Sequence, residues 1–185
     1  MTWKDFEIVL AVRGESSGVR MYYLDGEIEL MSPARDHENN KKKLARLLEV
    51  WALETGTPLE GFGSWTLKAA AKEAGAEPDE CYILGEPSAK DRPDLAIEVE
   101  WSRGGLSKRT IYERLGIGEL WLLDRSERVE IYVLENDRYV RARKSPLLAK
   151  LDVEWLASFL EHPTQTKAVI ALRDRMRRPA RSRRR

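Results

Sequence analysis

Residues 77–100 have the sequence EPDECYILGEPSAKDRPDLAIEVE, and this stretch decides the fold that we expect. It contains two short runs of strand-forming residues, 79–84 and 94–101, and a proline stands just before each. Proline is tolerated at the beginning of a strand, so both runs are predicted strands. Side chains alternate between the two faces of a strand. One face of the second strand is therefore fully apolar and belongs in the core, and the other carries Asp94, Glu98 and Glu100.

The acidic face of this strand has two interpretations. An antiparallel sheet with one solvated face shows the same alternation. Alternatively, the acids belong to a site, because the next predicted helix, 106–115, places Lys108 on the apolar stripe that packs on the sheet. A cation in the first helical turn is disfavoured by about 0.3–1 kcal/mol, and a buried unpaired charge is costly. Either the Lys108 ammonium meets carboxylates on the sheet, or the side chain extends into solvent.

The flanking sequence supplies the other predicted elements. We expect helices at 2–12, 37–56 and 152–160, a hairpin at 19–31, further strands at 59–67, 119–124, 128–135 and 138–143, and a polar loop around residue 75. From residue 37 the order is helix, strand, strand, strand, helix, strand. This order predicts an α/β fold in which helices flank a mixed sheet, with an added N-terminal hairpin and C-terminal strands.

Composition narrows the classes of protein. The chain has 185 residues, of which 42% are hydrophobic and 34% charged, as in a globular domain. One cysteine and two histidines exclude an internal disulfide and a tetrahedral Cys/His zinc site. The sequence contains no long apolar run, and its first ten residues carry acids where a signal peptide carries bases, so we expect a cytoplasmic protein without a membrane segment. We expect residues 1–165 to form one domain and residues 166–185 a basic, arginine-rich tail.

The end of the chain is strongly basic. Residues 173–185 contain eight arginines and one aspartate, which leaves the rest of the chain with a net charge of −6. Such an asymmetry is typical of a polyanion-binding tail, and it is also typical of a disordered, solubilising tail. The candidate nucleic-acid-binding residues are Arg177, Arg178, Arg181, Arg183, Arg184 and Arg185.

Asp79 and Glu98 are the candidate metal ligands. If the strands at 79–84 and 94–101 are neighbours, the two carboxylates converge on one small volume, where they repel each other. A hard divalent cation such as Mg²⁺ relieves this repulsion, since it prefers oxygen ligands and is often held by one or two carboxylates plus a substrate phosphate. A metal held in this way, with a nearby lysine, is suited to phosphodiester hydrolysis.

A series of motifs carries a family resemblance. These are LDGEIELMSP, His37 at a helix start, EPDECYIL, RPDLAIEV, Lys108 four residues before Tyr112, and GIGELWLLD. In this order, over about residues 20–160, they resemble the Uma-two family of restriction endonuclease-like proteins within the PD-(D/E)XK nuclease superfamily. The resemblance implies a helix-strand-strand-strand-helix-strand core and metal-dependent cleavage of DNA.

The resemblance also implies roles for particular residues. Asp79 matches the acid of the PD element, and Glu98 matches the acid of the (D/E)XK element. Glu100 stands where the superfamily has its lysine, and Lys108 matches the position on the next helix to which the family moves it. Glu100 is then either a third metal ligand or a partner of Lys108, and His37 and Glu38 are further candidates from the first core helix.

Two functions from different classes follow. The first is an endonuclease that uses Mg²⁺ (or Mn²⁺) at Asp79 and Glu98, with Lys108 assisting, to hydrolyse DNA phosphodiester bonds. The alternative is a catalytically inactive protein on the same fold that binds nucleic acid or a protein partner, which Glu100 and the acidic body favour. A third option is an interaction protein, a homodimer whose edge strands near 128–143 pair between two copies.

Overall fold

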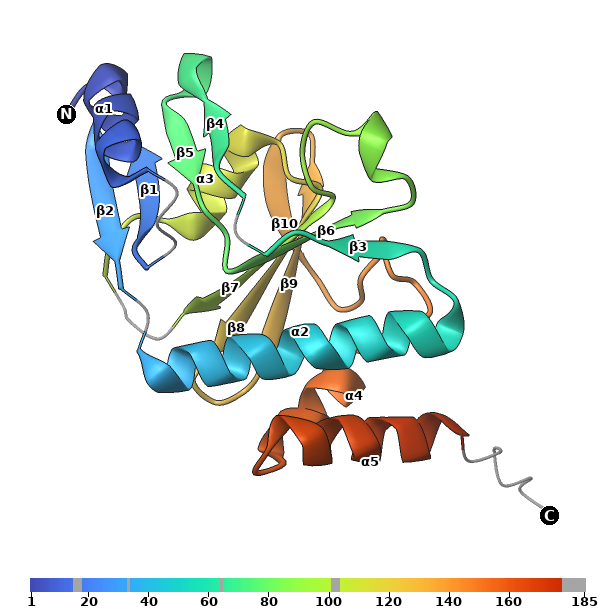
Figure 1. The fold of residues 1–185 in the computed structure, drawn as a ribbon. Coiled ribbons are helices and arrows are strands. Elements are labelled where there is room, and N and C mark those ends of the chain that lie inside the picture. Colours follow the sequence, from blue (N-terminus) through green and yellow to red (C-terminus); the bar gives the residue numbers. More distant parts are fainter. Residues whose placement is uncertain (15–17, 33, 64, 101–103, 178–185) are drawn as a thin grey trace.

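The computed structural model describes residues 1–14, 18–32, 34–63, 65–100 and 104–177 (Figure 1). A six-stranded sheet forms the centre, in the order β10-β9-β8-β7-β6-β3. Its strands are β3 (Leu59–Gly61), β6 (Glu80–Leu84), β7 (Leu95–Glu100), β8 (Glu119–Asp124), β9 (Val129–Glu135) and β10 (Arg138–Ala142). Only the β7–β8 pair among them is parallel, so the sheet is mixed, as the sequence predicts.

Helices cover both faces of the central sheet. The long helix α2 (Arg35–Thr55) lies across one face, and α4 (Val153–Ala157) and α5 (Gln165–Arg177) pack against it (Figure 1). The other face carries α3 (Lys108–Leu115) and the second sheet. Single turns of 3₁₀ helix stand at η1 (Ala70–Lys72), η2 (Pro87–Ala89) and η3 (Ser158–Glu161). The predicted α/β class with flanking helices is confirmed.

The alternation of β7 divides the interior into two cores. Leu95, Ile97 and Val99 point toward α2 and join the first core, which includes Trp51 and Trp121. On the opposite face, Ala96 joins the second core together with Ile111, Tyr112 and Leu115 of α3. Glu98, two residues after Ala96, points to the same face as Ala96. At Glu98 the acidic face of the predicted strand is therefore covered by α3, whereas Glu100 at its end is exposed.

The second sheet differs from the predicted secondary structure in two places, residues 59–67 and the segment around residue 75. Its order is β2-β1-β5-β4, from β1 (Arg20–Leu24), β2 (Glu27–Met31), β4 (Leu67–Ala69) and β5 (Ala74–Ala76). The single strand expected at 59–67 is instead two strands, one in each sheet. The expected polar loop around Gly75 is the buried strand β5. A Cβ at Gly75 would lie 2.6 Å from the ring of Phe6 in α1 (Trp3–Arg13), so the missing side chain lets α1 pack closely on this sheet.

The C-terminal helix α5 occupies the first part of the predicted tail. Ala168 and Leu172 are buried in the first core, and Arg173 and Arg177 each donate to Glu54 of α2. The helix therefore packs on the body of the protein through two apolar side chains and two arginine contacts. The basic composition of this segment did not indicate such packing. Among the described helices, none combines the length and the apolar composition that crossing a bilayer requires.

Candidate functional site

Asp79 lies immediately before β6, and its side chain is buried. β6 pairs antiparallel with β7, with Glu80 opposite Ile97, so Asp79 lies beside Glu98 and Val99. The backbone N–H of Val99 donates to Asp79 Oδ2 at 2.9 Å. The structure thus places the two predicted acids on adjacent strands.

Two basic groups hold the Asp79 carboxylate. Arg20 Nε of β1 lies 2.9 Å from Oδ1, and His37 Nε2 of α2 lies 3.3 Å from Oδ2. Burial alone would raise the pKa of Asp79, but the hydrogen bond with His37 and the charge of Arg20 outweigh burial and lower it. The same contact raises the pKa of His37, although burial opposes this. Asp79 is therefore an ionised carboxylate in a fixed orientation.

The pKa of Glu98 is shifted in the opposite direction to that of Asp79. Its carboxylate is buried and accepts hydrogen bonds from two tyrosines, Tyr22 at 3.0 Å and Tyr112 at 2.5 Å. Burial and the negative charge of Asp79 raise the pKa of Glu98 to about 8, against an ordinary value of 4.5. A pair of buried carboxyl groups whose pKa values shift in opposite directions is typical of a functional site.

Lys108 begins α3 and is buried, as are the other three members of the predicted stripe, Ile111, Tyr112 and Leu115. Its Nζ lies 3.5 Å from Glu29 Oε1 and 2.7 Å from the centroid of the Tyr22 ring. Burial lowers the pKa of Lys108, and the charges of Glu98 and Glu29 oppose this. The ammonium thus pairs with a carboxylate rather than extending into solvent, but its partner is Glu29 of the second sheet and not an acid of the strand that carries Glu98.

The residues of the second sheet are the part of the site that sequence reasoning missed. Arg20, Tyr22 and Glu29 come from the β1–β2 hairpin, about 50 or more residues before Asp79 along the chain. Only the resemblance of LDGEIELMSP, which contains Glu29, gave a signal that this hairpin belongs near the site. Tyr112 was noted as a motif residue, but its contact with Glu98 was not anticipated.

His37 and Glu38 approach Asp79 from the first turn of α2. Glu38 Oε2 lies 2.6 Å from Lys41 Nζ, and Glu38 Oε1 lies 3.6 Å from His37 Nδ1. Among the described residues, one ligand atom each from His37, Glu38 and Asp79 lie within 4.8 Å of one another. This set offers one imidazole nitrogen and two carboxylate oxygens, a mixed donor set that suits a transition metal such as Mn²⁺ better than Mg²⁺, which prefers oxygen ligands alone.

Other predicted residues lie elsewhere. Glu100 is exposed at the end of β7 opposite Asp124, while the ion pair of Lys108 is with Glu29. Arg177 ends α5 and donates to Glu54. The remaining predicted nucleic-acid-binding residues, Arg178, Arg181, Arg183, Arg184 and Arg185, lie outside the described residues.

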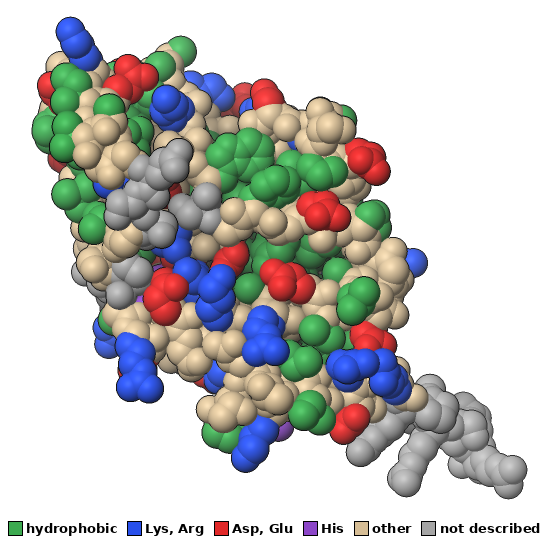
Figure 2. Space-filling view, in the orientation of Figure 1, with side chains coloured by type: hydrophobic (Ala, Val, Ile, Leu, Met, Phe, Trp, Pro, Cys, Tyr) green, Lys and Arg blue, Asp and Glu red, His purple; other side chains and the backbone are tan. Residues whose placement is uncertain are grey.

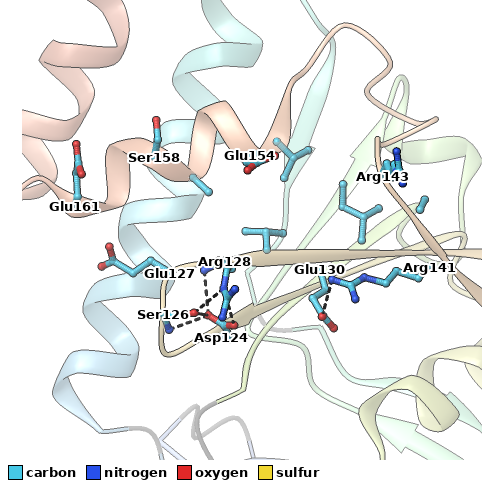
Figure 3. A pocket seen from close by; sticks show the side chains of 15 residues that line it. Asp124, Ser126, Glu127, Arg128, Glu130, Arg141, Arg143, Glu154, Ser158 and Glu161 are labelled. Atoms are coloured by element: carbon cyan, nitrogen blue, oxygen red, sulfur yellow. Dashed lines mark hydrogen bonds and ion pairs between the residues drawn. The ribbon is translucent and has the colours of Figure 1, made fainter.

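A hollow of about 1090 Å³ lies between β9, β10 and α4 (Figure 3). Its polar side chains largely satisfy each other: Glu130 pairs with Arg141 at 2.8 Å, and Asp124 accepts from Ser126 and from the backbone of Arg128. None of the predicted site residues lines it. We therefore assign the chemistry to the cluster around Asp79 and Glu98 instead.

A hard divalent cation fits this cluster. Asp79 and Glu98 offer carboxylate oxygens at neighbouring positions, and the pKa of Glu98 is raised first by burial and then by the charge of Asp79, a repulsion that a cation would relieve. Arg20 already compensates part of the charge of Asp79 at Oδ1. Oδ2 of Asp79 contacts His37 and the Val99 N–H, and the oxygens of Glu98 accept from two tyrosines, so a cation at this site would share these carboxylates with their protein partners.

The mixed sheet and its flanking helices define an α/β protein with two buried carboxyl groups at neighbouring positions. The model of the Uma2 (Uma-two) family, described as "putative restriction endonuclease", matches residues 3–161, and the chain belongs to this family. The fold is similar to a crystal structure from Anabaena variabilis described as "a putative nuclease belonging to DUF820". The two share 17% sequence identity with a TM-score of 0.55, over 86% of this chain and 99% of the other. The comparison with functionally curated proteins gives no match.

Proposed function

We propose that this protein is an endonuclease that hydrolyses DNA phosphodiester bonds with Mg²⁺ or Mn²⁺ held by Asp79 and Glu98. The observation that carries the proposal is that Asp79, Glu98 and Lys108 are all buried and close enough for their charges to shift one another's pKa, with the pKa of Glu98 raised to about 8. Family membership and the nuclease-like neighbour support the nuclease class.

Each residue has a role in this proposal. When bound, the metal polarises a phosphoryl oxygen and lowers the pKa of a water. Asp79, oriented by Arg20, His37 and the Val99 N–H, would supply an oxygen ligand whose lowered pKa favours the ionised form. Glu98, held by its tyrosines, supplies the second ligand once it gives up its proton. Lys108 Nζ holds a positive charge beside them and offsets the charge that develops on the phosphate.

The proposal also includes the other residues and properties predicted from the sequence. His37 and Glu38 orient Asp79 and add donor atoms on the α2 side, and Glu100 lies at the margin of the site. The tail arginines add sequence-independent affinity through phosphate contacts. A cytoplasmic location fits a DNA substrate, and the open edge strand β10 is the candidate surface for a homodimer.

Lys108→Met tests the proposal, because methionine keeps an apolar stem in the buried position and removes the charge. We expect cleavage of plasmid DNA in Mg²⁺ or Mn²⁺ to fall about 10²-fold, with Mn²⁺ affinity, measured by calorimetry, retained. Arg109→Gln, at the neighbouring exposed position of α3, is the matched control and should cleave like the wild type. Equal cleavage by Lys108→Met and the wild type would remove Lys108 from the mechanism.

A second candidate, a catalytically inactive nucleic-acid-binding protein, is favoured by one observation. Both carboxylates already have protein partners: Asp79 contacts Arg20 and His37, and Glu98 accepts from two tyrosines. The same samples separate the two candidates. The second predicts no cleavage with either metal, and DNA binding that ignores metal and Lys108→Met but weakens when residues 178–185 are removed.

A further inference from the structure

Phe62 is an unusual surface residue. Its side chain is 42% exposed, and it is the sole aromatic side chain in the exposed class among the described residues. The ring of Trp65, which is partly buried against the second core, lies 5.4 Å from it with an interplanar angle of 45°. The pair presents an aromatic surface in the β3–β4 connection, which crosses the face shown in Figure 1. Figure 2 shows hydrophobic side chains gathered on the upper part of this face, above a band of mixed charges.

The connection is fixed to the strand that carries Asp79. The backbone N–H of Phe62 donates to the carbonyl of Cys81 at 2.9 Å, and the Cys81 thiol donates to the carbonyl of Gly63. Cys81 is two residues after Asp79 and lies opposite Ala96 of β7. Because side chains two apart point to the same face, Asp79, Cys81 and Glu98 share one face of the central sheet. The connection that carries the aromatic pair is therefore bound to Cys81, two residues after Asp79 along the chain.

A basic hollow of about 520 Å³ continues from Trp65. Its charged lining residues are the four cations Lys68, Lys72, Arg92 and Arg114, and one acid, Asp91. Arg114 is paired with Asp25, Arg92 lies 3.3 Å from Asp91, and Lys68 lies 3.9 Å from Glu7. The side chains of Lys68 and Arg92 are about half exposed, and Lys72 is exposed. An aromatic surface beside a basic hollow is complementary to a chain that has both bases and phosphates.

We propose that Phe62 and Trp65 form a stacking platform for an unpaired base, and that the basic hollow binds the phosphates of the same single strand. Aromatic side chains stack on bases that a duplex keeps in its interior, so the platform selects single-stranded nucleic acid. The inference rests on the proposed function, since it takes the strand bound at the platform to be the substrate of the site of Asp79 and Glu98. It adds a substrate class, nucleic acid with an unpaired segment beside the cleaved bond.

Binding without cleavage tests the platform. The full-length protein is titrated in EDTA into a fluorescein-labelled 12-nucleotide single strand or the matching duplex, and anisotropy is measured. We expect Phe62→Ala to weaken single-strand binding roughly 5- to 100-fold and duplex binding less than twofold. Ile170→Ala, which removes an exposed apolar side chain from α5, is the control and should change neither. Phe62→Trp should retain single-strand binding and Phe62→Leu should not, a difference that loss of stability would not produce.

Further variants test the basic hollow and separate the platform from the proposed function. Lys68→Gln with Lys72→Gln should flatten the salt dependence of single-strand binding, and Lys144→Gln with Lys150→Gln, two exposed lysines outside the hollow, should not. Equal losses on single strand and duplex, or an unchanged single-strand affinity in Phe62→Ala, would overturn the inference. Because EDTA prevents metal-dependent cleavage, a protein that binds as expected but never cleaves would contradict the proposed function alone. Cleavage with unaffected binding by Phe62→Ala would contradict the platform alone.

Discussion

Asp79→Asn is expected to reduce metal-dependent DNA cleavage by about 10³-fold, the largest catalytic effect of any single substitution in this chain. A metal contributes several kcal/mol to stabilising the charge on a transferring phosphoryl group, and each 1.36 kcal/mol is a factor of ten in rate. Asparagine keeps the shape of the side chain and its contact with Val99 N–H, but it removes the charge that holds the cation. The measurement is the rate of plasmid cleavage as a function of Mg²⁺ concentration.

The control for this prediction is Asp94→Asn. Asp94 is an acid at the start of the same strand as Glu98, where it accepts from the Leu84 N–H and pairs with Lys90, away from the candidate site. We expect cleavage by this variant to stay within about twofold of the wild type. Asp79→Asn also leaves Arg20 without its ion-pair partner, so its thermal unfolding is recorded alongside. Undiminished cleavage by folded Asp79→Asn would exclude Asp79 as a metal ligand.

The second large effect concerns stability and pH. Glu98 has a pKa of about 8 in the folded protein and 4.5 as its ordinary value. Between these values the folded state keeps a proton that the unfolded state has released, so the free energy of unfolding falls as pH rises through this window. At 1.36 kcal/mol for each unit, metal-free wild type should lose roughly 3–5 kcal/mol relative to Glu98→Gln between pH 4.5 and pH 8.

Urea unfolding in EDTA at pH 5 and pH 8, for the wild type and for Glu98→Gln, measures this difference. Glutamine has no proton to lose, so its own contribution stays constant with pH. A saturating divalent cation at pH 8 should restore stability to the wild type and not to the variant, because it favours ionised Glu98. If the stability difference between the two proteins is the same at both pH values, Glu98 does not carry the raised pKa.

The central elements of the site could be predicted because their positions depend on local periodicity. The alternation of β7 places Glu98 opposite the apolar face, and the helical stripe of α3 places Lys108 against the sheet. The short spacing between the two predicted strands made their pairing a testable expectation, and the β6–β7 register confirms it. These inferences need only the repeats of 2.0 and 3.6 residues.

The surroundings of the site could not be predicted in the same way. Arg20, Tyr22 and Glu29 reach it because the hairpin pairs with β5 across about 50 residues, and no local pattern records this pairing. β5 itself, Ala-Gly-Ala, has the composition of a loop, and its burial follows from the packing of Phe6 on Gly75. The first part of the predicted tail is a packed helix, which was not predicted because its many arginines indicated a solvated segment. Two of these arginines pair with Glu54. The positions of the second sheet and of the C-terminal helix therefore depend on long-range strand pairing and close packing, which periodicity does not predict.

The most direct test of the account is a Mn²⁺ soak of crystals of the protein, with an anomalous difference map at the manganese edge. The account predicts one peak with oxygen ligands from both Asp79 and Glu98, with the Lys108 ammonium close by. A peak coordinated by His37, Glu38 and Asp79 but without Glu98, or no peak at saturating Mn²⁺, would contradict it.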